Sequence, residues 1–226
     1  MPRALLAVVL AALFFIAAPS TPDAKTPKLL ESVRPLAVLV VVKEHNLETG
    51  EVKLRGTSTN ICTVSSINTK LRYWLTAAHC VANTERKYYI MGEQVKVIMH
   101  DVPNDLAILQ TATVTLPALK LAKNEPEVGD RVEVAGHPFG WVFPVFTTGI
   151  VSAVKGQPWP ESEDGWNAYW MFISAPGAPG NSGSSVVNSK GEVISVVQMG
   201  FMRSFSPVMG GVPWDVLVKY RGYWKT

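Results

Sequence analysis

The hydrophobic positions along most of the chain form short runs, rich in β-branched and aromatic residues, separated by Gly, Pro, Asn and Asp. Runs of four to eight residues with such breaks are typical of strands in barrels and sandwiches. About a dozen strands are expected, at residues 36–42, 52–55, 59–64, 73–76, 87–91, 95–99 and 106–110, then at 131–135, 145–154, 169–174, 184–187 and 193–199. The pattern therefore predicts an all-β fold.

The breaks in this pattern predict how the body is divided. The stretch 116–130, with Pro117, Pro126 and Gly129, is the least strand-like interior segment, and it is the natural joint between two halves. We expect an N-terminal β half over residues 36–120 and a C-terminal β half over 121–226, each a barrel or part of a sandwich. A short helix is predicted over 214–219, with Pro213 in its first turn, and a hairpin turn over 188–191, where Asn and Gly tolerate positive φ.

The first residues differ from the rest of the chain. Arg3 is the only charged residue before Asp23, and residues 4–18 form an unbroken apolar run. One basic residue, a short apolar core and then small residues are the pattern of a secretory signal peptide. The run is shorter than the roughly 20 residues that span a bilayer. We predict a signal peptide over 1–20, with an uncleaved N-terminal anchor as the alternative, a flexible lead-in over 21–35, and a secreted or periplasmic body.

The composition excludes several classes of protein and of partner. With 47% hydrophobic residues, 17 Gly, 16 Pro and two Cys, the chain is neither collagen-like, coiled-coil, disordered nor a disulfide scaffold. Its 21 Lys and Arg against 18 Asp and Glu, without basic runs, argue against nucleic acid or an anionic membrane as the main partner. The partner must be sought in a specific site.

Three separate segments carry reactive groups that could form such a site. His79 lies in a small-residue segment after a predicted strand, Asp105 opens an apolar strand, and Ser182 lies between Gly180 and Gly183. A serine becomes a nucleophile when an imidazole removes its proton, and a carboxylate orients that imidazole. The glycines allow a sharp turn that points backbone N–H groups of Gly180 and Ser182 at one spot, as an oxyanion hole requires.

These segments, Leu75-Thr-Ala-Ala-His79-Cys80 and Gly180-Asn181-Ser182-Gly183 in the order His, Asp, Ser, resemble trypsin-like serine proteases over residues 36 to 220. The resemblance implies two six-stranded antiparallel β-barrels with a short C-terminal helix and a cleft between them. It implies His79 as general base and acid, Asp105 as orienting carboxylate, Ser182 as nucleophile, and an oxyanion hole at Gly180, Asn181 and Ser182. Asp101 competes for the carboxylate role, and we favour Asp105 because Asp-Leu-Ala-Ile-Leu matches the family segment.

The chain is most similar to the bacterial HtrA-like branch, through Gly136-His-Pro-Phe-Gly140 and residues 148–153 as well as the serine segment. Because the chain ends soon after Ser182, we expect no PDZ domain of the kind typical of that branch. Asn181 stands where digestive trypsin-like enzymes carry Asp, so activation by a freshly cut N-terminus is not expected.

The two cysteines, Cys62 and Cys80, match the family's disulfide beside the catalytic histidine. Such a disulfide would contribute roughly 3 kcal/mol. A thiol catalyst is the less favoured interpretation. The four histidines, His45, His79, His100 and His137, have no ligand-like spacing, so we predict neither a metal site nor a cofactor.

The resemblance also implies where substrate binds. The side-chain pocket would be bounded by residues 175–179 and 197–200 with Gly210 and Gly211, and its predicted contacts are Pro176, Gln198, Met199, Gly200 and Gly211. Because these segments contain no Asp or Glu, we expect an apolar residue before the cut. Residues 198–200 would pair with the extended backbone of a protein or peptide substrate.

The predicted function is therefore an exported serine endopeptidase that forms an acyl-enzyme. The alternative is a catalytically silent peptide-binding module of the same fold. An esterase is disfavoured because Ser182 is not in a Gly-x-Ser-x-Gly segment followed by a helix. The oligomeric state is not predicted.

Overall fold

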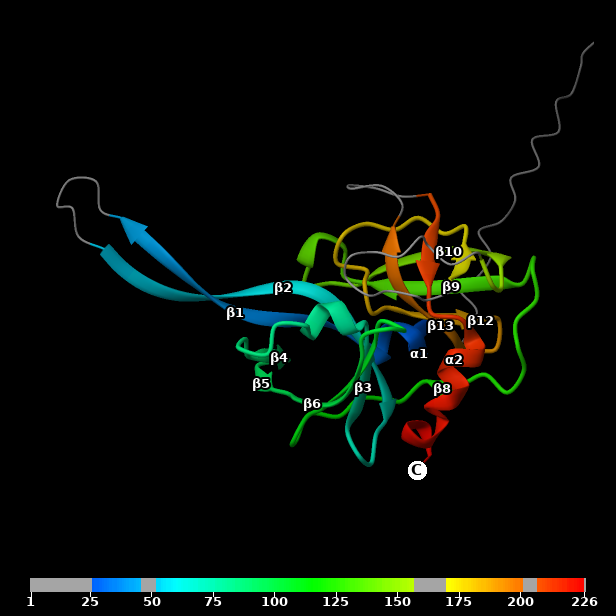
Figure 1. Ribbon diagram of the computed structural model, residues 1–226, viewed down its shortest axis with the longest axis horizontal. Coiled ribbons are helices and arrows are strands. Elements are labelled where there is room, and N and C mark those ends of the chain that lie inside the picture. Colours follow the sequence, from blue (N-terminus) through cyan, green and yellow to red (C-terminus); the bar gives the residue numbers. More distant parts are fainter. Residues whose placement is uncertain (1–25, 46–51, 157–169, 201–206, 226) are drawn as a thin grey trace, which may run out of the picture.

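The computed structural model describes residues 26–45, 52–156, 170–200 and 207–225, and within them strands predominate, as predicted (Figure 1). The strands form two sheets, one from each half of the chain. The first contains β1 (Val33–His45), β2 (Val52–Asn68), β3 (Tyr73–Thr76), β4 (Tyr88–Ile90), β5 (Glu93–Gln94), β6 (Lys96–Asp101) and β7 (Leu106–Gln110). The second contains β8 (Lys120–Leu121), β9 (Arg131–Gly136), β10 (Val145–Ala153), β11 (Met171–Ile173), β12 (Ser185–Asn188), β13 (Glu192–Gly200) and β14 (Met209–Gly211).

The second sheet is a closed six-stranded antiparallel barrel. Its order is β12-β9-β10-β11-β14-β13, and β12 also pairs with β13, which completes the ring. β8 adds to β13 as a short parallel strand. The turn from β12 to β13 has the predicted form, because the Gly191 N–H donates to the Asn188 carbonyl at 2.8 Å and Gly191 has φ +71°.

The first sheet curves in the same way but differs from the predicted barrel in how it closes. Its order is β5-β4-β1-β2-β3-β7-β6, so β5 and β6 are its two edges. Only Val95 separates them in the chain. Two strands so closely joined cannot pair with each other, because a hairpin needs a connection of at least about two residues. The chain itself therefore links the two edges.

The β1–β2 hairpin is longer than predicted. Residues 36–42, 52–55 and 59–64 were expected as three strands, but β1 and β2 pair continuously from Val33 with Ser65 to His45 with Val52, with one irregularity at Leu36. Their outer part extends from the body as a two-stranded arm (Figure 1). The polar residues of 56–60 do not end β2, since β1 provides backbone partners along its length.

Residues 26–35 differ from the flexible lead-in predicted over 21–35. They form α1 (Thr26–Ser32) and the start of β1. Leu29 is 1% exposed and Val33 is fully buried. Pro27 interrupted the local apolar pattern, but proline is tolerated in the first turn of a helix. The other predicted helix is present as α2 (Trp214–Lys219), with Pro213 as its N-cap.

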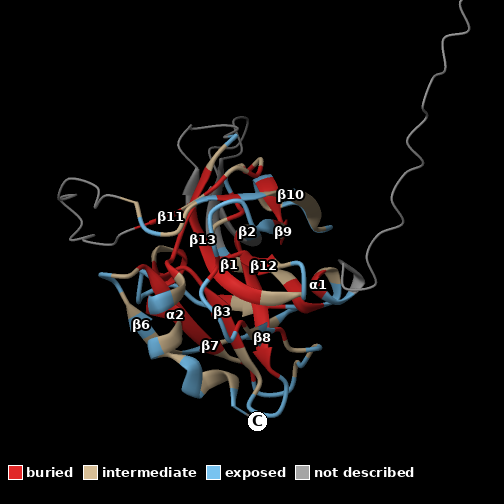
Figure 2. Cartoon of the chain, turned by 90° about the vertical axis from the view of Figure 1, so that its right-hand side faces the viewer, coloured by how far each residue is buried: buried red, intermediate tan, exposed pale blue. Residues whose placement is uncertain are grey.

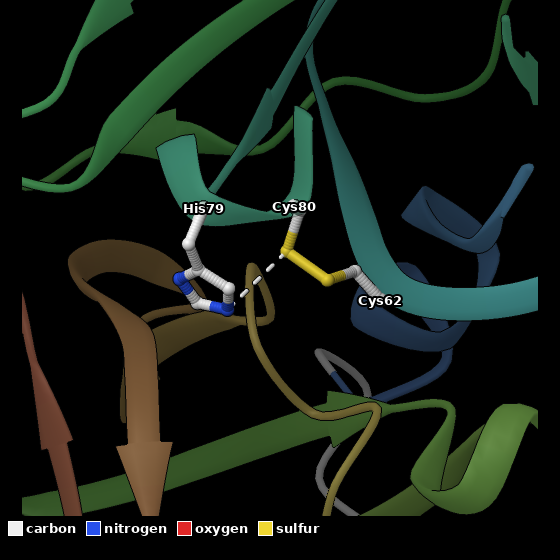
Figure 3. Close-up of side chains that lie close together, drawn as sticks. All are labelled: Cys62, His79 and Cys80. Carbon is white, nitrogen blue, oxygen red and sulfur yellow. Dashed lines mark hydrogen bonds between the residues drawn. A yellow bond between two sulfur atoms is a disulfide. The ribbon is translucent and has the colours of Figure 1, made fainter. Parts of the chain in front are cut away.

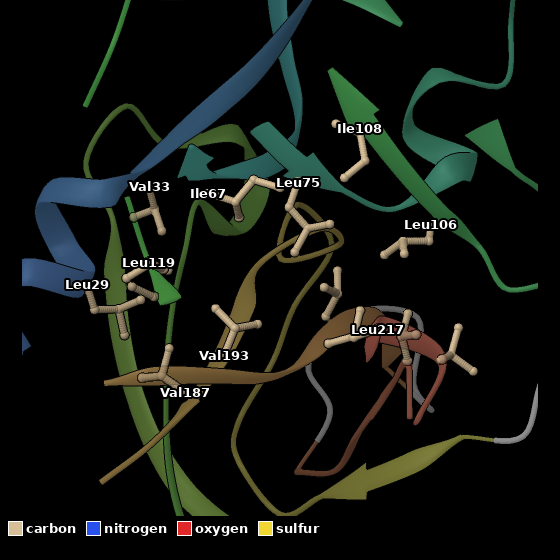
Figure 4. Packing of buried hydrophobic residues seen from close by; sticks show 14 residues of the cluster. Leu29, Val33, Ile67, Leu75, Leu106, Ile108, Leu119, Val187, Val193 and Leu217 are labelled. Atoms are coloured by element: carbon tan, nitrogen blue, oxygen red, sulfur yellow. The ribbon is translucent and has the colours of Figure 1, made fainter. Parts of the chain in front are cut away.

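Three apolar clusters stabilise the fold, one inside each sheet and one between them. The buried residues run along strands of both sheets, including β7, β12 and β13 (Figure 2). The cluster between the sheets also receives both helices (Figure 4); its buried members are Leu29, Val33, Ile67, Leu75, Leu106, Ile108, Leu119, Ala135, Val187, Val193, Val196, Val212, Val216 and Leu217. The two halves therefore pack directly on one another, which fixes the relative positions of the loops at their junction.

Within the described ranges, no helix has the length and apolar character needed to cross a membrane. The predicted signal peptide over 1–20 lies outside those ranges.

Candidate functional site

His79 and Asp105 meet beside the ends of two paired strands of the first sheet. His79 lies in a 3₁₀ helix, Ala78–Val81, directly after β3, and Asp105 directly precedes β7, which pairs with β3. The carboxylate of Asp105 accepts two hydrogen bonds from the same residue, at 2.8 Å from the His79 backbone N–H and at 2.8 Å from Nδ1 of its ring. Because Asp105 is 1% exposed, the carboxylate holds the ring in one orientation, with the proton on Nδ1.

Asp101, the competing carboxylate, is used differently. It accepts hydrogen bonds from the backbone N–H and side-chain amide of Asn104, at 3.2 and 2.7 Å, and from the Tyr220 hydroxyl. Burial and this hydrogen bond to Asp101 raise the pKa of Tyr220 to about 12. Asp101 therefore anchors the turn that leads into Asp105, and Asp105 contacts His79.

Ser182 lies in a tight double turn before β12. Residues 178–181 form a turn closed by a 3.0 Å hydrogen bond from the Asn181 N–H to the Ala178 carbonyl. Gly180 is its third residue, with φ +99°, which with Pro179 in second place is the pattern of a type II turn. The hydroxyl of Ser182 donates to the Gln198 carbonyl at 3.1 Å.

This turn changes the predicted set of oxyanion donors. The N–H of Asn181 is engaged within the turn and is not aimed at a ligand. The N–H groups of Gly180 and Ser182 make no backbone hydrogen bond within the described part of the chain. Of the three N–H groups predicted to bind an oxyanion, that of Asn181 is therefore already engaged by the turn.

The nucleophile turn is packed against the 136–140 segment and against β2. The Phe139 N–H donates to the Pro179 carbonyl at 2.6 Å. A Cβ on Gly136 would overlap the Ser184 hydroxyl and lie 2.7 Å from Oδ1 of Asn181. On the other side, Thr63 of β2 contacts the turn through backbone and side chain. Thr63 was missed in the sequence because nothing local distinguishes it from other strand residues.

The residues predicted to contact substrate differ in burial and in their hydrogen bonds. Gln198 is 1% exposed, and its amide donates to the Asn104 carbonyl at 2.9 Å, so its side chain points to the turn before β7. Gly211 is buried within β14, and Pro176 is half-buried. Met199 and Gly200 belong to β13, where they pair with Gly210 and Met209; the side chain of Met199 lies outside the described part. The backbone of β13 lies beside the nucleophile turn, because the Gln198 carbonyl accepts from the Ser182 hydroxyl.

Cys62 and Cys80 form the predicted disulfide, next to the His79 ring (Figure 3). Sγ of Cys80 lies 3.7 Å from Nε2 of His79, and the ligand atoms of the three residues lie within 4.8 Å of one another. A metal-binding cysteine must be a thiolate, whereas both sulfurs here are bonded to each other. The disulfide therefore packs against the imidazole and binds no metal.

His137 is a buried histidine with a defined tautomer. It is 1% exposed, and its Nδ1 lies 2.9 Å from the Trp141 carbonyl, which can only accept, so Nδ1 carries the proton. Nε2 is buried without a partner in the described residues. Burial lowers the pKa of His137. The hydrogen bond to the Trp141 carbonyl opposes this with an effect smaller than that of burial, and the charge of Arg34 lowers the pKa further.

This shift predicts a pH dependence of stability. The pKa of His137 is lower in the folded than in the unfolded protein, so its contribution is complete above pH of about 6.5. It declines as the pH falls from there through the folded pKa, because the unfolded chain binds the proton first. His137→Asn keeps an amide donor for Trp141 without the titration. Urea unfolding between pH 7.5 and 5 should show a smaller loss of free energy in this variant than in the wild type; parallel losses would contradict the prediction.

The chain is similar to known proteins both in sequence and in structure. In sequence, the chain is 37% identical over 153 residues to a "Probable periplasmic serine endoprotease DegP-like" of Hahella chejuensis, covering 64% of this chain and 31% of that relative. A protein of the same description from Pseudomonas putida strain GB-1 is 36% identical over 155 residues, covering 65% and 31%. This chain therefore spans about a third of the length of the curated relatives it matches.

In structure, the chain is similar to "HtrA-type protease AlgW with decapeptide", with a TM-score of 0.72 and 19% identity over 88% of this chain and 65% of the other. A second structure, of an AlgW variant with decapeptide, has a TM-score of 0.66 and 22% identity, and covers 86% and 64%. These likenesses show a shared fold. Residues 62–196, which include His79, Asp105 and Ser182, match the model of the trypsin-like peptidase domain, and the chain belongs to that family.

Proposed function

We propose that this protein is a serine endopeptidase that cleaves protein or peptide substrates through an acyl-enzyme. The observation that carries the proposal is the pair of 2.8 Å hydrogen bonds from His79 to the buried Asp105, in a chain of the trypsin-like peptidase family. A buried carboxylate that orients an imidazole serves to stabilise the charge the ring acquires as a general base.

In the proposed mechanism, the hydroxyl of Ser182 attacks the carbonyl carbon of the scissile bond while His79 takes its proton. The hydroxyl has one proton, which it now gives to the Gln198 carbonyl, so it must rotate toward His79 when substrate binds. The N–H groups of Gly180 and Ser182 would then stabilise the oxyanion. His79 returns the proton to the leaving amine, and water releases the acyl group by the same steps.

The substrate is proposed to be an extended polypeptide that is cut after an apolar residue. The pocket segments 175–179, 197–200 and 210–211 contain no acidic residue to pair with Lys or Arg. β13 offers backbone groups beside the nucleophile for pairing with an extended chain. The similar AlgW structures are titled as complexes with a decapeptide, which is consistent with this substrate class.

We further propose that the protein is exported. The relatives are named as periplasmic, and residues 1–20 have the pattern of a signal peptide. The oxidising environment outside the cytoplasm suits the Cys62–Cys80 disulfide. The two halves of the chain, proposed to divide at residue 120, would meet at the active site.

The test is labelling with a fluorophosphonate, which reacts with activated serines. We expect stoichiometric labelling of the wild type and loss of labelling in Ser182→Ala and His79→Ala. Ser184→Ala is the matched control, because this neighbouring serine is buried and should leave labelling intact. Labelling should coincide with hydrolysis of peptides that carry an apolar residue before the cut.

A folded wild type that is not labelled, but binds the same peptides, would overturn the proposal and support the catalytically silent peptide-binding module. Labelling with turnover of simple esters but not of peptides would instead indicate an esterase.

A further inference from the structure

Thr63 joins the two halves of the molecule at the nucleophile turn. It lies in β2, one residue after Cys62, and is fully buried. Its backbone N–H donates to the Ser182 carbonyl at 2.8 Å, and its carbonyl accepts from the Thr76 hydroxyl at 2.9 Å. The first sheet therefore holds Ser182 through the backbone of this one residue.

The side chain of Thr63 makes a second link. Its hydroxyl accepts a hydrogen bond from the His137 N–H at 2.9 Å and donates one to the Gly180 carbonyl at 2.9 Å. A hydroxyl can donate and accept at once. The hydroxyl therefore links the His137 N–H to the Gly180 carbonyl.

Two peptide groups flank Gly180, whose N–H is a proposed oxyanion donor. One of them contains the Gly180 carbonyl, which Thr63 holds. The other belongs to Pro179, whose carbonyl accepts from the Phe139 N–H at 2.6 Å. In a trans peptide, C=O and N–H point in opposite directions, so holding the Pro179 carbonyl aims the Gly180 N–H to the other side. Both peptides around Gly180 are thus fixed from outside the turn.

Gly180 has no side chain that could hold its backbone in place. Its φ of +99° is only one of the φ values that glycine adopts readily. If the hydroxyl were removed, the His137 N–H and the Gly180 carbonyl would both lose a buried partner, which is unfavourable. The turn could then relax to other peptide orientations that satisfy these groups but misdirect the Gly180 N–H.

We propose that the Thr63 hydroxyl is a positioning group for the oxyanion turn. It acts through the Gly180 peptide and does not touch the substrate. This inference rests on the proposed peptidase function, and it adds to that function a residue outside the His-Asp-Ser set.

The decisive comparison is Thr63→Val against Thr63→Ser. Valine keeps the branched shape without the hydroxyl, whereas serine keeps the hydroxyl without the methyl group. We expect Thr63→Val to lower kcat and the fluorophosphonate labelling rate by about 10- to 100-fold, since one misdirected oxyanion donor has a cost of this order. KM should stay within about threefold, because the backbone that binds substrate is unchanged. Thr63→Ser should retain most of the activity.

Amide hydrogen exchange gives a readout that does not depend on activity. In Thr63→Val, the hydrogen-bonded amides of His137 and Asn181 should exchange about 10-fold faster or more, and in Thr63→Ser they should remain slow. If Thr63→Val does not fold, Thr63→Ala removes the same hydroxyl without placing a methyl group against the two polar backbone groups.

Equal rates and equal exchange in Thr63→Val and wild type would overturn the positioning role while the peptidase proposal stands. A fall of kcat by the same factor in Thr63→Val and Thr63→Ser would assign the effect to packing and would also overturn the positioning role. If the wild type is inactive and unlabelled, the peptidase proposal fails. Unchanged exchange in Thr63→Val would then overturn the positioning role as well, and accelerated exchange would support it as a structural device.

Discussion

Asp105→Asn should lower kcat by about 10⁴-fold with little change in KM, the loss expected when the carboxylate that orients a catalytic histidine is replaced by an amide. Oδ1 and Oδ2 of Asp105 accept from the backbone N–H and from Nδ1 of His79. An amide can accept at only one of these positions. If the new side chain turns its NH₂ group toward Nδ1, Nδ1 must accept and the ring carries its proton on Nε2. The ring then cannot take a proton from Ser182. Steady-state kinetics on a peptide substrate would measure the effect.

Asp101→Asn is the matched control for this prediction. Asp101 lies four residues before Asp105, and its partners are Asn104 and Tyr220. An amide oxygen can still accept from Tyr220, so we expect a loss of less than about 10-fold in kcat. Circular dichroism should show that both variants are folded. If Asp101→Asn were the more damaging change, the assignment of Asp105 would be wrong.

Gly183→Ala should be the most destabilising small substitution near the site. Gly183 has φ +85°, and a Cβ there would overlap the Thr63 carbonyl and the Thr76 hydroxyl. The left-handed backbone and the overlap together predict a loss of roughly 2 to 5 kcal/mol in the free energy of unfolding. Because Thr63 also holds Ser182, the displaced serine should lose about 100-fold or more in activity even where the protein folds.

Gly92→Ala separates the two causes. Gly92 has a similar φ of +82°, but nothing lies within 4 Å of the Cβ that would be added. It should therefore show only the backbone cost of about 1 to 2 kcal/mol and full activity. Urea unfolding of both variants measures the difference. Equal destabilisation would mean that the overlap at Gly183 is relieved by a small shift of its neighbours.

The strands and the hairpin turn at 188–191 were predictable because each depends on a pattern within a few residues, whereas the closed barrel of the second half was implied by the family resemblance. Alternating apolar positions and turn residues act locally. The open edges of the first sheet and the unbroken β2 were not, since they depend on which strands pair. α1 was missed for the same reason: its burial of Leu29 depends on contacts with residues from both halves.

The sequence by itself identified the family and the three chemical groups, because short segments resemble those of trypsin-like serine proteases, and that resemblance also implied the pairing of the two cysteines. Only the tertiary structure showed that Asp105 contacts His79 while Asp101 bonds Tyr220, engaged the Asn181 N–H within a turn, and directed the Gln198 side chain to Asn104. It also brought Thr63 to the nucleophile turn. These outcomes depend on hydrogen bonds between residues far apart in the chain, and packing of the two halves decides which of those residues meet.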